Sequence, residues 1–113
     1  MIFSIGNHVE MIIKGLKTQT RRSSDRYEVG KLYTVQPGRT KKGIAKGKIK
    51  IIYKKCERRN GNKFLTSPED AKAEGGYSIR EFEELYEKIH PNWDERFAYT
   101  FRFVPTRESA SRG

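Results

Sequence analysis

The order of the expected elements is the strongest constraint on the fold of this chain. Stretches with the alternating pattern of β-strands are separated by helical stretches of only two or three turns. Helices this short do not suit the crossovers of a doubly wound parallel sheet. We therefore expect an α+β fold, a small, strongly curved β-barrel flanked by about three helices. The expected strands are residues 1–5, 17–22, 31–36, 48–55 and 97–104, and the expected helices are 7–16, 67–74 and 78–90.

Local signals define the ends of the expected helices. Asn7, with a glutamate three residues later, forms an asparagine version of a capping box, and Gly15 is suited to end that first helix. Ser67 precedes a proline and two acidic residues, which is typical of a helix start. Ser78 opens a second capping box, ahead of an apolar face that continues until Pro91 stops the helix.

Aromatic residues alternate along the last expected strand. Residues 97–104 place Phe or Tyr at every second position, a pattern typical of a strand with one buried face. Core packing is a better explanation for these rings than a platform for stacking bases. Tyr33, Tyr53 and Trp93 offer π faces on which bases could stack, but half-buried packing is the simpler interpretation of each.

Length and composition indicate one domain without metal or cofactor. We expect a folded unit over residues 1–104 and a polar, flexible tail over 105–113. Cys56 is the single cysteine, so an intrachain disulfide is excluded, and His8 and His90 lie far apart in the sequence. No apolar run approaches the roughly 20 residues that span a membrane. We expect a cytoplasmic monomer that binds no membrane.

Positive charge is concentrated in the first half of the chain. The formal net charge is +10, but residues 14–59 carry 16 lysines and arginines against three acidic residues. Residues 68–90 carry seven acidic residues against three basic ones. A charge that served solubility alone would be more evenly mixed. This polarised distribution is typical of a protein that binds nucleic acid with one face.

Residues 15–22, with the sequence Gly-Leu-Lys-Thr-Gln-Thr-Arg-Arg, place cations and hydroxyls directly after the first expected helix. In an extended chain, Lys17 and Arg21 point to one side, while Thr20 and Arg22 point to the other. A polar cluster could form on either side. An ordinary strand with solvated basic side chains has the same pattern, so the spacing alone does not decide.

At this segment the chain resembles the ASCH domain, a branch of the PUA-like β-barrel superfamily. The hallmark of that family is Gly-x-Lys-Thr-x-Thr-x-Arg after its first helix. The resemblance covers nearly the whole chain, because further blocks follow in the family's order. These blocks are residues 27–31 before a strand, 73–76, the helix at 78–84 and the closing strand at 99–104. The resemblance implies a PUA-like barrel.

The same resemblance implies RNA binding or chemistry on RNA components. One branch of the family is similar to small enzymes that hydrolyse N4-acetylcytidine to cytidine and acetate without a metal. The functional residues of that branch match Lys17, Thr20 and Glu74 here. The chain differs from the enzymes in having Arg21 and Arg22 where they commonly keep an aliphatic residue before one arginine. It also has two glycines after the matching glutamate.

General chemistry offers roles for these residues in amide cleavage. A lysine whose pKa is lowered by burial could act as the base, so Lys17 could activate the hydroxyl of Thr20. Glu74 could orient the lysine or protonate the leaving amine. The ordinary alternatives are a surface lysine, a β-forming threonine and a charge at a helix end. A ribonuclease that uses the same groups is a third possibility.

The leading expectation is an RNA-binding module with a nucleoside or nucleotide pocket. Arg22 could hold a phosphate or carboxylate with its planar fork. Basic side chains in the connection after residue 37 would contact phosphates without reading sequence. The expected nucleic-acid or ligand contacts are Thr18, Arg21, Arg22, Lys41, Lys42, Lys46 and Lys48.

Overall fold

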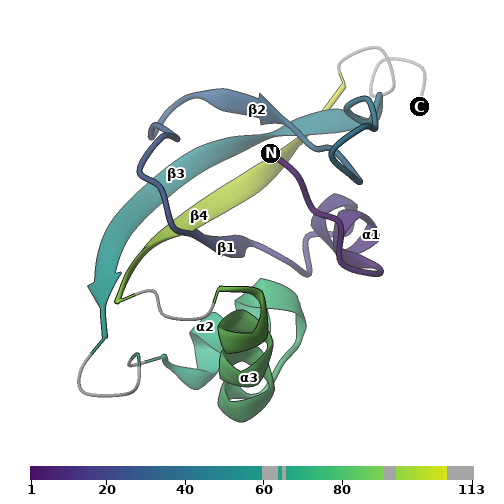
Figure 1. The fold of residues 1–113 in the computed structure, drawn as a ribbon. Coiled ribbons are helices and arrows are strands. Elements are labelled where there is room, and N and C mark those ends of the chain that lie inside the picture. The colour runs from purple at the N-terminus through teal and green to yellow at the C-terminus, as the bar shows by residue number, and fades with distance from the viewer. Residues whose placement is uncertain (60–63, 65, 91–93, 107–113) are drawn as a thin grey trace.

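A computed structural model of the chain describes residues 1–59, 64, 66–90 and 94–106, and over this part it confirms an α+β fold (Figure 1). Its elements follow the expected order, with the strands and the helices near their expected positions. The elements are α1 (His8–Ile13), β1 (Gln19–Arg22), β2 (Leu32–Thr34), β3 (Gly47–Arg58), α2 (Pro68–Gly75), α3 (Ile79–Ile89) and β4 (Glu95–Pro105).

The four strands form one antiparallel sheet in the order β1-β4-β3-β2. The central strands β3 and β4 are 12 and 11 residues long, whereas the edge strands β1 and β2 have four and three residues. A closed barrel needs the two edge strands to pair with each other. Within the described residues β1 and β2 do not pair, so the expected barrel is not confirmed and the sheet is open.

The N-terminal segment was expected to be a strand, but it contributes only one parallel bridge, between Ile2 and Gln36. Phe3 donates its backbone N–H to Gln36 O at 2.7 Å, and Gln36 donates to Met1 O at 2.8 Å. Phe3 is buried, and its ring packs edge-on against Phe101 with the ring centroids 6.0 Å apart. The segment therefore lies against the core beside the sheet instead of extending it.

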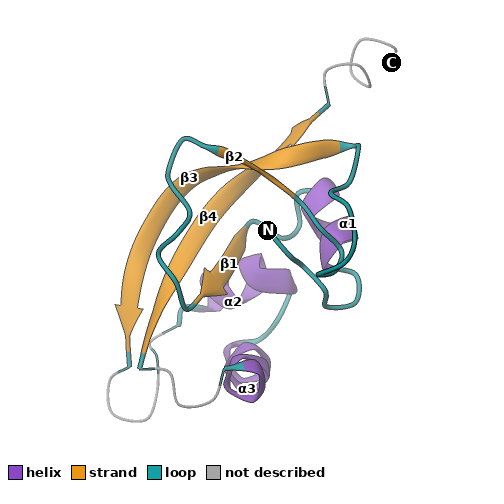
Figure 2. Cartoon of the chain, turned by 45° about the horizontal axis from the view of Figure 1, so that its top comes forward, coloured by secondary structure: helices purple, strands orange, loops and turns teal. Residues whose placement is uncertain are grey.

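The core has two parts. The larger part gathers apolar residues of the N-terminal segment, α1 and the strands, and the smaller part lies between α2 and α3. Figures 1 and 2 show α2 and α3 together beside β1, with α1 near the start of that strand. The larger cluster comprises Met1, Phe3, Ile12, Val35, Ile49, Ile51, Tyr99 and Phe101, and the smaller one Phe64, Ala71, Phe82 and Tyr86.

Two of the three expected helix caps are confirmed. Ser67 accepts a hydrogen bond from the Asp70 N–H at 3.0 Å, and Ser78 forms the full capping box with Glu81. The expected cap at Asn7 is wrong, because its backbone is not extended and its side chain makes no capping bond. Tertiary packing, with Ile12 fully buried, holds this short helix instead.

The first helix ends as its glycine predicts. Gly15 has a φ of +75°, a left-handed conformation that glycine adopts without strain. The chain then turns back, and Leu16 donates its N–H to Met11 O at 2.8 Å. This reversal is what directs the next residue, Lys17, into the protein.

Some expected features lie outside the described residues. These are the helix stop at Pro91, the ring of Trp93 and the tail from residue 107 onward. Pro105, expected to begin the tail, is the last residue of β4 and pairs with Gly47.

Candidate ligand-binding cleft

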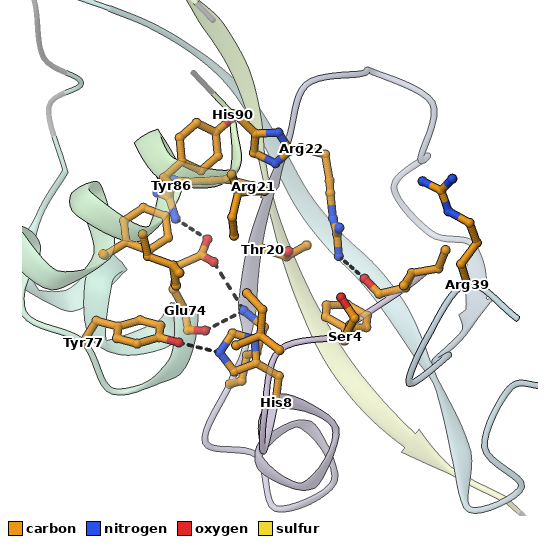
Figure 3. Close-up of a pocket in the computed structure, with 17 residues that line it drawn as sticks. Ser4, His8, Thr20, Arg21, Arg22, Arg39, Glu74, Tyr77, Tyr86 and His90 are labelled. Carbon is orange, nitrogen blue, oxygen red and sulfur yellow. Dashed lines mark hydrogen bonds and ion pairs between the residues drawn. The ribbon is translucent and has the colours of Figure 1, made fainter. Parts of the chain in front are cut away.

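A cavity of about 460 Å³ opens between the N-terminal segment, β1 and the helices α2 and α3 (Figure 3). Cavities of this volume are in the range that proteins use for small ligands. Its wall combines cations, one carboxylate, hydroxyls and aromatic rings. The polar and aromatic-polar lining residues are Ser4, His8, Lys17, Thr20, Arg21, Arg22, Arg39, Glu74, Tyr77, Tyr86 and His90.

Lys17 is buried in this wall and fully hydrogen-bonded. It is only 2% exposed, which excludes the ordinary surface lysine. Its ammonium group donates to Glu74 Oε1 at 3.3 Å, to the backbone O of Glu74 at 2.5 Å and to Gln19 O at 2.8 Å. Burial lowers the pKa of Lys17, against the opposing charge and hydrogen bond of Glu74.

Glu74 links Lys17 to a second buried cation. It is the second-last residue of α2, and its Oε2 accepts a hydrogen bond from Arg21 Nη1 at 2.7 Å. Glu74 is 4% exposed, and Arg21 is equally buried. The carboxylate therefore neutralises two cations that come from the segment before and within β1.

The chain of buried charges continues beyond the cavity. Arg21 donates two hydrogen bonds to Glu57 of β3, at 2.9 and 3.1 Å, and Arg96 of β4 donates to the same carboxylate at 2.7 Å. Arg96 also pairs with Glu83 of α3 at 3.0 Å. Although burial favours the neutral acid, the hydrogen bonds from both arginines lower the pKa of Glu57. This network joins the sheet to both helices.

Thr20 lies on the same cavity wall as Lys17. It is a buried residue of β1, paired with Tyr99 of β4, and Figure 3 shows it between the Glu74 side and the Arg22 side of the cavity. Within the described residues no hydrogen bond joins the Thr20 hydroxyl to Lys17. All three protons of the Lys17 ammonium already point at other oxygens.

Arg22 also lines the cavity, but unlike Lys17 and Arg21 it does not pair with Glu74. Its guanidinium donates from Nη2 to Ile2 O at 2.7 Å and lies 5.0 Å from the centroid of the Phe3 ring. Its Nε is buried and has no hydrogen-bond partner among the described residues. Burial lowers the pKa of Arg22, although an arginine stays protonated at neutral pH. Arg39, which is exposed, adds a further cation to the lining.

His8 was not predicted as a site residue, yet it lines the cavity and contacts Tyr77. The ring nitrogen Nε2 lies 2.7 Å from the Tyr77 hydroxyl. Gly75 allows this contact, because a Cβ at that position would lie 2.8 Å from the Tyr77 ring and 2.9 Å from His8 Nε2. Gly75, the first of the two glycines after Glu74, is therefore the sequence feature that indicates the close packing of His8 against Tyr77.

His8 should make stability depend on pH in a defined window. Burial and the nearby charge of Lys17 lower the pKa of His8 to about 4, from an ordinary value of 6.5. Between these values the unfolded chain binds a proton that the folded protein excludes, so stability falls as the pH decreases. His8→Gln should reduce this dependence. Urea unfolding of both proteins at pH 7, 5.5 and 4.5 measures it, and identical pH profiles would contradict the assignment.

The structure brings five of the ten predicted site residues together. Lys17, Thr20, Arg21, Arg22 and Glu74 all line the cavity. Thr18 is not among its lining residues. Its backbone instead joins the start of the β1 segment to α2 and β4. The Thr18 N–H donates to Ala73 O, and the Thr18 carbonyl accepts from the Phe101 N–H, each at 2.9 Å.

The predicted phosphate-contacting lysines lie elsewhere. They are exposed side chains of the connection between β2 and β3 and of the first residues of β3, and none lines the cavity. These residues are Lys41, Lys42, Lys46 and Lys48. These four lysines therefore lie outside the cleft, although Arg39 of the same connection lines it.

Within the described residues no group of three or more His, Cys, Asp and Glu side chains is placed to hold a metal ion. The same part of the chain has no helix that is both long and apolar enough to cross a membrane. A cytoplasmic location and a monomeric state stay predictions from the sequence.

Comparison by sequence finds no matching family model and no matching curated protein. Comparison by structure does find similar proteins. The chain is similar to an ASCH domain from Lactobacillus crispatus JV V101, with 16% identity and a TM-score of 0.70. The alignment covers 92% of this chain and 77% of that one.

A second similar structure is a protein of the DUF984 family from Enterococcus faecalis V583. It shares 18% identity with a TM-score of 0.67, over 96% of this chain and 73% of the other. At such identities the similarity concerns the fold, because folds are shared by proteins of different function. A place in the wider PUA-like superfamily stays a prediction. The chain has an ASCH-like fold.

Proposed function

We propose that this ASCH-like domain binds RNA and receives a nucleoside or nucleotide in its cleft. The observation that carries the proposal is the composition of the cavity. It offers Arg22, whose Nε has no hydrogen-bond partner in the described part of the chain, together with the rings of Tyr77 and Tyr86. Cations suit phosphate, and aromatic rings suit bases, so both parts of a nucleotide find complementary groups.

The basic surface supports binding of a longer nucleic acid. The connection between β2 and β3 carries exposed lysines, and residues 14–59 hold most of the positive charge of the chain. Such side chains attract phosphates at any sequence and steer association. RNA tracking over this connection could present one nucleotide to the cleft, because Arg39 of the same connection lines it.

Affinity for RNA should decrease strongly with salt. If four phosphates of a single strand are neutralised, binding should weaken about 50-fold between about 50 and 200 mM salt. Fluorescence anisotropy with a labelled single-stranded RNA measures this. A triple variant with Lys41, Lys42 and Lys46 changed to alanine should flatten the dependence. An affinity that is constant over this range would overturn the proposed RNA-binding function.

A matched control comes from lysines in the acidic part of the chain. Lys72 of α2 and Lys88 of α3 are exposed like the three lysines above, but they lie among acidic residues. Changing both to alanine should leave the salt dependence as it is in the parent protein. An equal loss per lysine removed in the two variants would mean that net charge, and not the position of the lysines, determines affinity.

A second candidate function is metal-independent hydrolysis of N4-acetylcytidine. The observation that favours it is the buried contact between Lys17 and Glu74 beside Thr20. In this scheme the Thr20 hydroxyl attacks the acetyl carbonyl and gives its proton to Lys17. The C–N bond then breaks as Lys17 passes that proton to the leaving amine of cytidine, and water hydrolyses the acetyl ester on Thr20 to acetate and the free hydroxyl. Lys17 must first release a proton and turn its lone pair toward Thr20. Its lowered pKa assists that step, but the three hydrogen bonds of its ammonium oppose it. Binding is therefore the leading proposal.

The catalytic candidate is tested at Thr20. Under amidohydrolysis, Thr20→Val should reduce release of cytidine and acetate at least 100-fold, since removing a nucleophile removes the covalent step. Thr18→Val changes a similar residue outside the cavity lining and should keep full turnover. Chromatography of the products distinguishes them. A folded parent protein that binds RNA but releases nothing would refute this candidate.

The ribonuclease alternative has no separate support among the described residues. Substrate RNA should therefore stay intact during the salt titration. Denaturing electrophoresis of the recovered RNA shows whether this holds.

A further inference from the structure

Arg21 and Arg96, which are buried, and Arg22, which is half-buried, differ in how their charge is neutralised. Arg21 pairs with Glu57, Glu74 and Asp70, and Arg96 pairs with Glu57 and Glu83. No carboxylate among the described residues lies within ion-pair distance of the Arg22 guanidinium, although it too is largely withdrawn from water. A cation in such a place is normally paired with an anion.

Two buried polar atoms indicate where a ligand could form hydrogen bonds in the cavity. Over the described residues, the buried side-chain nitrogen and oxygen atoms without a hydrogen-bond partner are Arg22 Nε and the Tyr86 hydroxyl. Buried polar groups of this kind are rare in folded proteins and call for an explanation. Both residues line the same cavity, from β1 and from α3 (Figure 3). A single ligand could satisfy both atoms.

The chemistry of each atom restricts that ligand. The Arg22 Nε is a charged donor and requires an acceptor, for which an anionic oxygen is the strongest choice. Tyr86 is 5% exposed, and burial raises the pKa of its hydroxyl to about 12, so it remains protonated and can donate. Arg39 also lines the cavity and, like Arg22, pairs with no carboxylate among the described residues, so the cleft holds more positive charge than a neutral ligand needs.

We propose that the cleft binds its ligand through an anionic phosphate oxygen placed on Arg22, with a second acceptor on the Tyr86 hydroxyl. The ligand is then a nucleoside monophosphate unit, free or at the end of an RNA strand, and a neutral nucleoside is a poor substitute. This inference rests on the proposed function, because it specifies which form of the nucleoside enters the cleft.

The first test compares ligands in the unmodified protein. Isothermal titration should give at least tenfold tighter binding for 3′- or 5′-CMP than for cytidine, because a charge-assisted hydrogen bond is gained. Short RNAs with and without a terminal phosphate distinguish the two sources of the group. Equal affinity for the phosphate and hydroxyl forms of every ligand would overturn the inference while leaving nucleoside binding in place.

The second test removes each unpartnered atom. Arg22→Met should abolish the preference for CMP over cytidine, whereas Arg26→Met, four residues later and outside the cavity lining, should keep it. Tyr86→Phe should weaken CMP binding several-fold without lowering the unfolding midpoint, since the Tyr86 hydroxyl has no hydrogen-bond partner among the described residues. A preference that survives Arg22→Met in a folded variant would contradict the placement of the phosphate.

The outcomes also separate this inference from the function on which it rests. Salt-dependent RNA binding with no difference between phosphate and hydroxyl ligands rejects only the phosphate position. If the unmodified protein binds neither RNA nor mononucleotides, the proposed function itself is rejected, and the inference with it.

Discussion

Replacing Glu74 by glutamine should lower the free energy of unfolding by about 3 to 5 kcal/mol. The Glu74 carboxylate accepts hydrogen bonds from Lys17 at 3.3 Å and from Arg21 at 2.7 Å, and both of these cations are buried. A neutral amide keeps the size of the side chain but leaves the two positive charges without this counter-charge. Denaturant unfolding monitored by circular dichroism measures the loss.

Glu84 of α3 provides the matched control for this change. It pairs with Arg80 at 3.0 Å, but both side chains are exposed, at 69% and 88%. Exposed pairs contribute little, so Glu84→Gln should change stability by less than about 0.5 kcal/mol. Equal effects of the two substitutions would refute the special role of the buried charge.

The expected instability also decides how catalysis should be tested. Loss of turnover in a Glu74 variant would mix a chemical effect with a structural one, because the same carboxylate holds the cleft together. Thr20 has no hydrogen bond to Lys17 and belongs to no ion pair in the described part of the chain. Its substitution therefore gives the cleaner test of chemistry.

Replacing Arg96 by leucine should cost about 3 to 5 kcal/mol as well. Its side chain is fully buried, donates to Glu57 at 2.7 Å and to Thr66 at 2.9 Å, and pairs with Glu83. The guanidinium also lies 3.9 Å from the centroid of the Phe64 ring. Thermal and denaturant unfolding of the variant measure the combined loss of charge pairs and packing.

Two comparisons sharpen the Arg96 prediction. Arg80→Leu removes an arginine that is 88% exposed and should be nearly neutral. A double-mutant cycle that combines Arg96→Leu with Glu57→Gln should show a coupling of about 1 to 3 kcal/mol, because the two residues share one network. Additive effects would mean that the pair acts through packing alone.

The helices and strands could be predicted from the sequence because their signals are local. Ser67 and Ser78 cap helices through hydrogen bonds that span three residues, and Gly15 ends the first helix through its own backbone. The alternation expected in residues 17–22 holds for Lys17 and Arg21, which both donate to Glu74. Thr20 and Arg22 were expected on the opposite side, yet they line the same cavity. Asn7 fails as a cap because tertiary packing, and not capping, stabilises α1.

The cleft could be predicted only in part. The resemblance to ASCH domains pointed to Lys17, Thr20 and Glu74, which do line one cavity. Nothing in the local pattern at Glu57 or Arg96 indicated a buried ion pair, since glutamate and arginine are usually exposed. Their pairing depends on the register of β3 against β4, which sets Glu57 opposite Arg96.

The sequence by itself determined the class of the fold, the order of its elements and the concentration of positive charge, because the elements follow from local patterns and the charge from a count along the chain. The tertiary structure alone decided that the sheet is open, that Lys17 is buried and that Arg22 has no carboxylate partner among the described residues. Lys17 and Glu74 are separated by 57 positions in the sequence. Contacts at that separation arise only when the sheet and the helices pack together, and packing determines which buried charges are neutralised and which remain for a ligand.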